Sequence, residues 1–196
     1  MNNSYRSKIK SIVAAVIALV LVIVFWTGYN GLVRKDADVD LKFSLIKSIM
    51  QLRYDALTQM IGAIQGLEDY ATTVWTMITD ARADYSNNKS SEDPNTINET
   101  DGALTEAIYS LLVVVEDNRP VGVTVDSAYI GYMDSVLSME YQLDVARQNY
   151  NSSVTSFNVS IRLFPNVLYA SLFGFNTPKS LWEIPEHADE IPSFGD

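Results

Sequence analysis

The sequence predicts an all-α protein: an N-terminal transmembrane helix followed by an elongated antiparallel bundle of three to four helices. Three observations lead to this fold class. An uncharged apolar run lies near the N-terminus, two long segments repeat apolar residues at steps of three and four, and no alternating stretch is long enough for a sheet. With 196 residues, the chain has room for one domain plus an anchor.

The N-terminal segment divides into a basic flank, residues 1–10, and a transmembrane signal anchor, residues 11–29. The anchor carries no charged residue. A helix rising about 1.5 Å per residue needs roughly 20 residues to cross a bilayer core of about 30 Å, which this stretch supplies. The alternative is a cleaved signal peptide, but the exit F-W-T-G-Y-N-G lacks the small residues that a cleavage site needs at alternate positions.

The orientation follows from the basic residues that flank the anchor. Arg6, Lys8 and Lys10 precede it without any acid, whereas the other flank mixes basic and acidic residues. Basic residues favour the cytoplasmic side of a membrane. We therefore expect a single-pass protein with a cytoplasmic N-terminus and an extracytoplasmic bundle.

Residues 30–175 are assigned to the helical bundle. An apolar repeat runs from Val39 to Tyr85 in one phase and predicts a single helix of roughly 50 residues. Residues 86–102 contain mostly turn-forming residues and predict a loop. A short core helix is expected at about 103–117.

A second long helix begins at Asp126 or Ser127, either of which can cap it, and Pro165 ends it. Its apolar face, which we call the seam, is formed by Leu143, Tyr150, Val154, Phe157, Ile161 and Phe164.

Polar residues interrupt the seams of both long helices. They are the candidate polar seam residues Arg53, Glu140, Arg147, Asn151 and Asn158. A charge in a helix seam is costly unless it is paired, and Glu140 and Arg147 lie roughly 10 Å apart along the axis, so a third group must join them. We interpret these residues as a network that fixes helix pairing, with the asparagines bonding between helices. The alternatives are a ligand or proton site, or arginines that reach water along the seam.

Residues 176–196 form an acidic C-terminal tail, and its acids beside His187 are interpreted as solvated. The candidate docking or interaction residues before and within the tail are Leu172, Phe173, Phe175 and Trp182. We expect them to dock on the end of the bundle; the alternatives are contact with the membrane surface or with a partner.

Several motifs occur together in this order. They are Y-N-G-L-V at 29–33, E-x-x-L-x-x-A-R-x-x-Y-N at 140–151, F-N-x-x-I-R-x-F-P at 157–165 and L-F-G-F at 172–175. Through them the chain resembles the LemA family of membrane-anchored helical proteins, across nearly its whole length. The resemblance implies an α-helical bundle at an inner or cytoplasmic membrane. It implies no particular reaction, and some relatives are associated with membrane organisation.

Composition narrows the function classes. The net charge of −10, without a basic cluster beyond the first ten residues, argues against nucleic-acid binding. Cysteine is absent and histidine occurs once, so we expect no enzyme, metal or cofactor. The primary hypothesis is a scaffold or adaptor whose partners are the lipid bilayer and membrane proteins or a second copy of itself. The alternatives are a receptor holding a small ligand in the polar seam and, less favoured, an enzyme that uses carboxylates alone.

Overall fold

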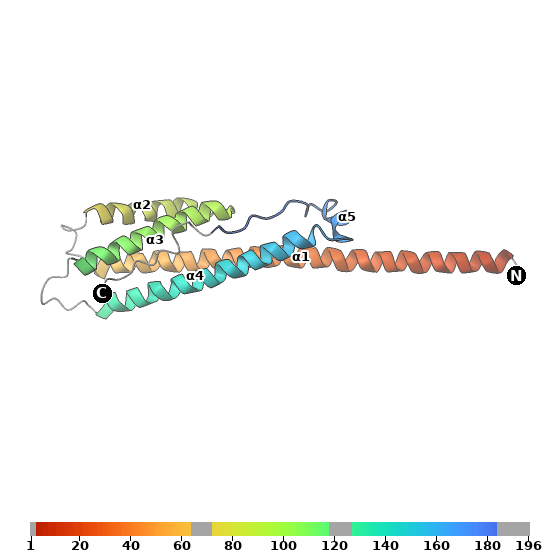
Figure 1. Cartoon of the computed structure of the whole chain (residues 1–196), viewed down its shortest axis with the longest axis horizontal. Coiled ribbons are helices and arrows are strands. Elements are labelled where there is room, and N and C mark those ends of the chain that lie inside the picture. Colours follow the sequence, from red (N-terminus) through yellow and green to blue (C-terminus); the bar gives the residue numbers. More distant parts are fainter. Residues whose placement is uncertain (1–2, 64–71, 118–126, 184–196) are drawn as a thin grey trace. The chain divides into compact units, whose positions relative to one another are not determined.

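The structure is a computed structural model of the chain, and it describes residues 3–63, 72–117 and 127–183. Its helices are α1 (Asn3–Ala63), α2 (Thr72–Asn88), α3 (Pro94–Asp117), α4 (Ser127–Ser160) and the short α5 (Asn166–Ala170) (Figure 1). No strand occurs in the described ranges. The predicted all-α fold class is confirmed.

The chain divides into two compact units. We call Met1–Asp40 with Ser152–Lys179 the anchor unit, and Leu41–Asn151 with Ser180–Asp196 the bundle unit. The long helices α1 and α4 each contribute residues to both units.

In the anchor unit, α1 contains one stretch long and apolar enough to cross a membrane, near the N-terminus. All side chains from Tyr5 to Thr27 are exposed. The hydroxyl of Thr27 donates to the carbonyl of Ile23 at 2.9 Å, so this polar group is satisfied inside the helix, as a lipid environment requires. The first part of α1 is therefore a candidate membrane anchor.

In the bundle unit, the predicted seam of α1 is buried. Its apolar members Phe43, Ile46, Met50 and Leu57 are at most 7% exposed. The helix α2 runs back along α1, because the rings of Tyr54 and Tyr85 stack with centroids 4.8 Å apart. The prediction of one helix from Val39 to Tyr85 was therefore wrong, although its middle part, 64–71, lies outside the described residues. Apolar spacing shows which side of a helix is buried, but it does not show whether the chain continues straight or reverses. One long helix and two helices that pack on the same core can therefore have the same apolar repeat.

The helix α2 extends to Asn88 and α3 begins at Pro94, so the loop prediction was wrong for residues 86–88 and 94–102. A carboxylate oxygen of Asp93 accepts the backbone N–H of Asn95 at 3.1 Å, which makes Asp93 the N-cap and Pro94 the first helical residue. Asp93 and Pro94, which lie in the stretch predicted as a loop, therefore start a helix. The connection between α2 and α3 is therefore only residues 89–93.

The helix α4 starts at Ser127, as expected, and its seam is buried at Leu143, Tyr150, Val154, Phe157 and Ile161. It ends at Ser160, five residues before Pro165, because a proline ring clashes with the carbonyl one turn earlier. The side-chain amide of Asn166 donates to the carbonyl of Ser160 at 3.1 Å, which also accepts the backbone N–H of Leu163. Phe164 therefore leaves the helical phase and is 80% exposed, contrary to its prediction as a seam residue.

Successive helices α1 to α4 run in alternating directions within the bundle unit (Figure 1). On α1 and α4, Arg53 pairs with Glu140 while Phe43 packs against Tyr150, so these helices are antiparallel. On α3, Asp101 pairs with Arg147 of α4. The contacts between α1 and α4 thus establish the relative direction of the two long helices, which the sequence leaves open.

Candidate functional site

The interior of the bundle unit contains a network of four charged side chains. Arg53 of α1 forms ion pairs with Asp101 of α3 and with Glu140 of α4, the latter at 2.6 Å. Asp101 also pairs, through its other carboxylate oxygen, with Arg147 of α4. Glu140 and Arg147 are therefore connected not by one third group but by two in series, Arg53 and Asp101.

The network is buried and electrically balanced. Arg53 and Asp101 are each 1% exposed and Arg147 is 8% exposed, whereas the Glu140 side chain is about one third exposed. Two positive and two negative charges cancel, which lowers the cost of burying any one of them. Three helices contribute, so the network can form only when α1, α3 and α4 are in register.

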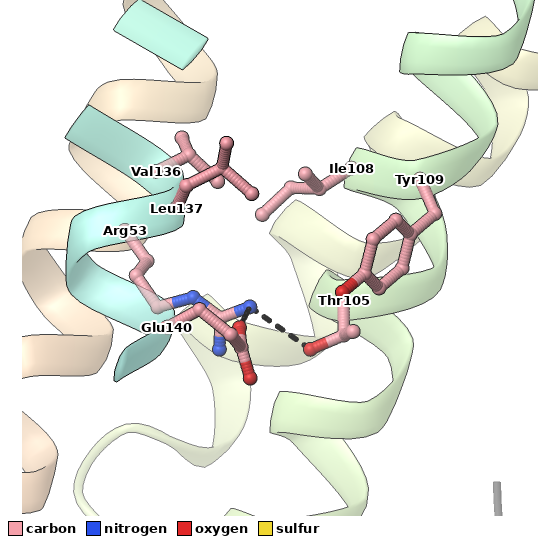
Figure 2. Close-up of a pocket in the computed structure, with 7 residues that line it drawn as sticks. All are labelled: Arg53, Thr105, Ile108, Tyr109, Val136, Leu137 and Glu140. Carbon is pink, nitrogen blue, oxygen red and sulfur yellow. Dashed lines mark hydrogen bonds and ion pairs between the residues drawn. The ribbon is translucent and has the colours of Figure 1, made fainter. Parts of the chain in front are cut away.

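Beyond the ion pairs, one further polar group binds the network, whereas two of its nitrogen atoms have no partner in the described part of the chain. Figure 2 shows the Arg53 guanidinium donating to the Thr105 hydroxyl, at 2.9 Å, beside its ion pair with Glu140. The Nε atoms of Arg53 and Arg147 are buried and find no acceptor among the described residues. Burial lowers the pKa of Arg147 to about 10, and the positive charge of Arg53 acts in the same direction. Arg147 is therefore still protonated at neutral pH.

A small pocket lies beside the network. Its lining residues are Arg53, Thr105, Ile108, Tyr109, Val136, Leu137 and Glu140 (Figure 2). Its cavity volume of about 10 Å³ is at the lower limit for a single water molecule. This pocket cannot hold a metabolite in the described geometry.

Trp182 covers one side of the network. It is 2% exposed, and the Arg147 guanidinium lies over its ring at 5.7 Å from the centroid, within cation–π range. The ring also packs against Phe43 and Tyr150, at centroid distances of 6.5 and 6.4 Å. The docking expected for Trp182 therefore occurs on the α1–α4 seam, and this part of the acidic tail is not solvated.

The two asparagines bind backbone rather than a neighbouring helix. In the bundle unit, Asn151 donates to the Trp182 carbonyl at 3.0 Å and accepts the Trp182 N–H at 2.7 Å. In the anchor unit, Asn158 makes the same pair of bonds with Lys179, at 2.8 and 2.9 Å. The prediction of bonds between helices was wrong for both, because a side-chain amide matches the donor and acceptor of an extended peptide.

The side chain of Lys179, whose backbone is bound by Asn158, also forms ion pairs with two carboxylates. Its ammonium group lies 2.7 Å from carboxylate oxygens of both Asp36 and Asp40 on α1. Burial alone lowers the pKa of Lys179, but hydrogen bonds and the charges of these two carboxylates outweigh it and raise the pKa above its ordinary value. The tail is thus fixed in the anchor unit as well.

The other candidate docking residues lie beside the candidate anchor. Phe173 packs edge-on against Phe25 and Tyr29, with centroids 5.7 and 4.9 Å apart, and Phe175 packs against Tyr29 at 6.2 Å. Leu172 does not dock in this way and is 72% exposed. The two phenylalanines therefore dock on the anchor part of α1, and not on the end of the bundle as expected.

Sequence reasoning missed Asp101, Thr105 and Lys179. Asp101 lies in the stretch interpreted as loop, although it continues the phase of Ile97, Leu104 and Ile108 at steps of four, three and four. Extending that phase backwards from Leu104 is the signal that would have found it. Lys179 lies in a segment without periodicity, where no such signal exists.

Comparison with known proteins gives one result. A family model described as the LemA family matches residues 42–194, which is most of the chain. A search of curated proteins found no match.

Proposed function

Because the chain belongs to the LemA family, we propose that it is a non-enzymatic, membrane-tethered helical bundle that acts as a scaffold or adaptor for membrane proteins or for membrane organisation. The first part of α1 would hold the protein at the bilayer. The charged interior of the bundle would keep its shape, because each described charge of the network pairs with another member.

The observation that carries this proposal is the exposed apolar surface of the bundle unit. On α4, Leu137, Tyr141 and Val145 follow one another at steps of four, so they lie on one face. They are 54%, 72% and 39% exposed. Such stripes on helices whose other faces fill a core are typical of protein contact surfaces. A second stripe on α1 consists of Leu41, Leu45 and Leu52.

The receptor hypothesis receives less support. Sites for small molecules usually enclose about 300–1,000 Å³. The pocket beside Arg53 has about 10 Å³, and the arginine that lines it is already bound to Asp101, Thr105 and Glu140. A ligand would have to replace these partners and separate the helices.

We place the protein in the cell or inner membrane with its bundle outside the cytoplasm. The basic N-terminal flank supports this orientation. Protease treatment of spheroplasts that express the full chain with a C-terminal tag tests it. Removal of the tag is expected, and protection of the tag in spheroplasts, with removal after lysis, would contradict the orientation.

Site-specific photocrosslinking in native membranes tests the scaffold proposal. A photoreactive phenylalanine analogue replaces Tyr141 in one variant and Gln142, an exposed polar position on the same helix that is not part of the stripe, in the control. We expect a discrete adduct with another membrane protein from position 141 only. The substitution Leu137→Ser should remove that adduct without lowering the melting temperature, because Leu137 is exposed.

Other outcomes decide against parts of the proposal. An adduct consisting only of two copies of this chain would replace the adaptor role by self-assembly. Equal patterns from positions 141 and 142 would refute a specific contact surface on α4.

A further inference from the structure

A second apolar surface lies in the anchor unit, in the segment that follows α4. We call residues 163–175 the apolar turn. Six of its side chains are between 44% and 80% exposed: Leu163, Phe164, Val167, Leu168, Leu172 and Phe173. No charged residue occurs between Arg162 and Lys179. A concentration of this kind on a short segment needs a covering partner.

The position of this surface identifies the partner. Tyr169 and Phe173 pack edge-on against Phe25 of α1, with centroids 5.2 and 5.7 Å apart. Phe25 belongs to the candidate anchor and lies four residues before Tyr29, which is about 6 Å along a helix axis. Rings that contact Phe25 must share its depth when the anchor is in a bilayer.

The turn is fitted closely to the anchor helix. A Cβ atom at Gly28 would overlap the Tyr169 hydroxyl and would come within 3.2 Å of the Asn166 side chain. Gly31, one turn further along, has nothing within 4 Å of such an atom. The close approach is therefore local to the part of α1 that the sequence assigns to the anchor.

Part of the backbone of the apolar turn is hydrogen-bonded within the turn itself. The N–H of Val167 donates to the Leu163 carbonyl at 2.9 Å, and that of Phe175 donates to the Ala170 carbonyl, also at 2.9 Å. Gly174 has a φ of 83°, the left-handed conformation that commonly closes a helix in this way. Internal bonding of this kind permits a segment to enter an apolar environment, where free backbone groups are costly.

We propose that the apolar turn inserts into the lipid leaflet next to the anchor, so that the protein holds the bilayer at two points of its chain. The occupant of the exposed surface is the acyl-chain and headgroup boundary of the membrane that α1 crosses. The inference rests on the proposed membrane tether and adds to it a second, non-spanning contact. The turn is too short to span a bilayer.

Depth-dependent fluorescence quenching tests this inference. The chain contains no cysteine, so single cysteines can be labelled specifically in the full-length protein. The environment-sensitive dye NBD is attached at Leu168→Cys or Leu172→Cys, both exposed positions whose replacement removes little packing. The protein is reconstituted in phosphatidylcholine and phosphatidylglycerol vesicles that contain lipids with nitroxide-labelled acyl chains.

Two further positions serve as references. Val20→Cys lies within the candidate anchor. Ser152→Cys is an exposed position of α4 next to Ser153, which donates to Asp38, nine residues beyond Tyr29 on α1. That separation is about 13 Å along a helix, outside the leaflet.

We expect labels at 168 and 172 to lose most of their emission to the lipid quencher and little to aqueous iodide, as at 20, with the reverse at 152. If 168 and 172 behave like 152 while 20 is quenched, the inference is refuted and the tether stands. If 20 is also not quenched, the tether and the inference both fail. Shielding from both quenchers at 168 and 172 would mean that protein covers the turn, which also refutes lipid insertion.

Discussion

Replacing Asp101 with asparagine removes one charge from the buried network and keeps the side-chain size. Asp101 pairs with Arg53 and Arg147, which are 1% and 8% exposed. Without its charge, the network contains two arginines and only the carboxylate of Glu140. One positive charge is then uncompensated in the interior. Changing one partner of a buried ion pair typically costs about 3–5 kcal/mol.

This cost is large enough to measure by thermal unfolding. For a domain of this size, 1 kcal/mol shifts the melting temperature by about 2–4 °C, so Asp101→Asn should lower it by roughly 6–20 °C. Near-ultraviolet circular dichroism of the full-length protein in detergent is the suitable assay, because it follows aromatic packing and not the helical signal of the anchor. Asp134→Asn, at an exposed position of α4, is the matched control and should shift it by roughly 2 °C or less.

A double-mutant cycle separates the network from a general effect of the substitution. Arg147→Met should also be strongly destabilising, because it leaves the buried charge of Asp101 with one partner fewer. Combined with Asp101→Asn, it should cost less than the sum of the two, by about 0.5–3 kcal/mol, because the groups interact. Strict additivity, or a melting temperature for Asp101→Asn equal to that of Asp134→Asn, would refute the reasoning.

Three further predictions concern single residues. Asn151→Ala removes both hydrogen bonds to the Trp182 backbone and should lower the free energy of unfolding by about 1–3 kcal/mol relative to the control Asn149→Ala. Equal melting curves would contradict a stabilising role for these two bonds. Burial, followed by the charges of neighbouring groups, raises the pKa of Tyr85 to about 12, so the folded state favours the neutral phenol. The stability from this preference is present below pH 10 and is lost between pH 10 and 12. The late phase of the tyrosinate absorbance should lose one group in Tyr85→Phe, and an unchanged late phase there would contradict the assignment to Tyr85. Gly31→Ala should stabilise α1 by up to about 1 kcal/mol, whereas Gly28→Ala should destabilise the anchor unit by overlap with the ring packed there; equal shifts in melting temperature would argue against that close packing.

The sequence predicts the seams well because packing requires them. Positions such as Met50, Leu143 and Val154 are buried as their spacing indicates, and Arg53 and Arg147 occupy the same phase. A charge at a seam position therefore reveals where a network lies. It does not reveal the partner, because Asp101 follows a helix start that resembles a turn.

The sequence predicts the tail poorly for a different reason. Trp182 and Lys179 are held by asparagine side chains on α4 and not by a repeating pattern of their own. An extended segment that is fixed through single side chains has no periodicity to detect. The direction of α2 was missed because a helical phase shows which face is buried but not where the chain reverses.

The position of Asp101 in the chain has a consequence for assembly. The carboxylate of Asp101 belongs to α3. Its ion-pair partner Arg147 belongs to α4, which is synthesised later. During synthesis from the N-terminus, α1 and α3 emerge first and Arg53 and Asp101 can already meet. When α4 follows, its seam brings Glu140 and Arg147 as a balanced pair, and only one register places each opposite its counter-charge. Without α3, the α1–α4 seam would contain the positive charges of Arg53 and Arg147 and only one carboxylate, that of Glu140. Other alignments of the two helices would then be favoured. The helix α3 thus favours the correct alignment of α1 and α4.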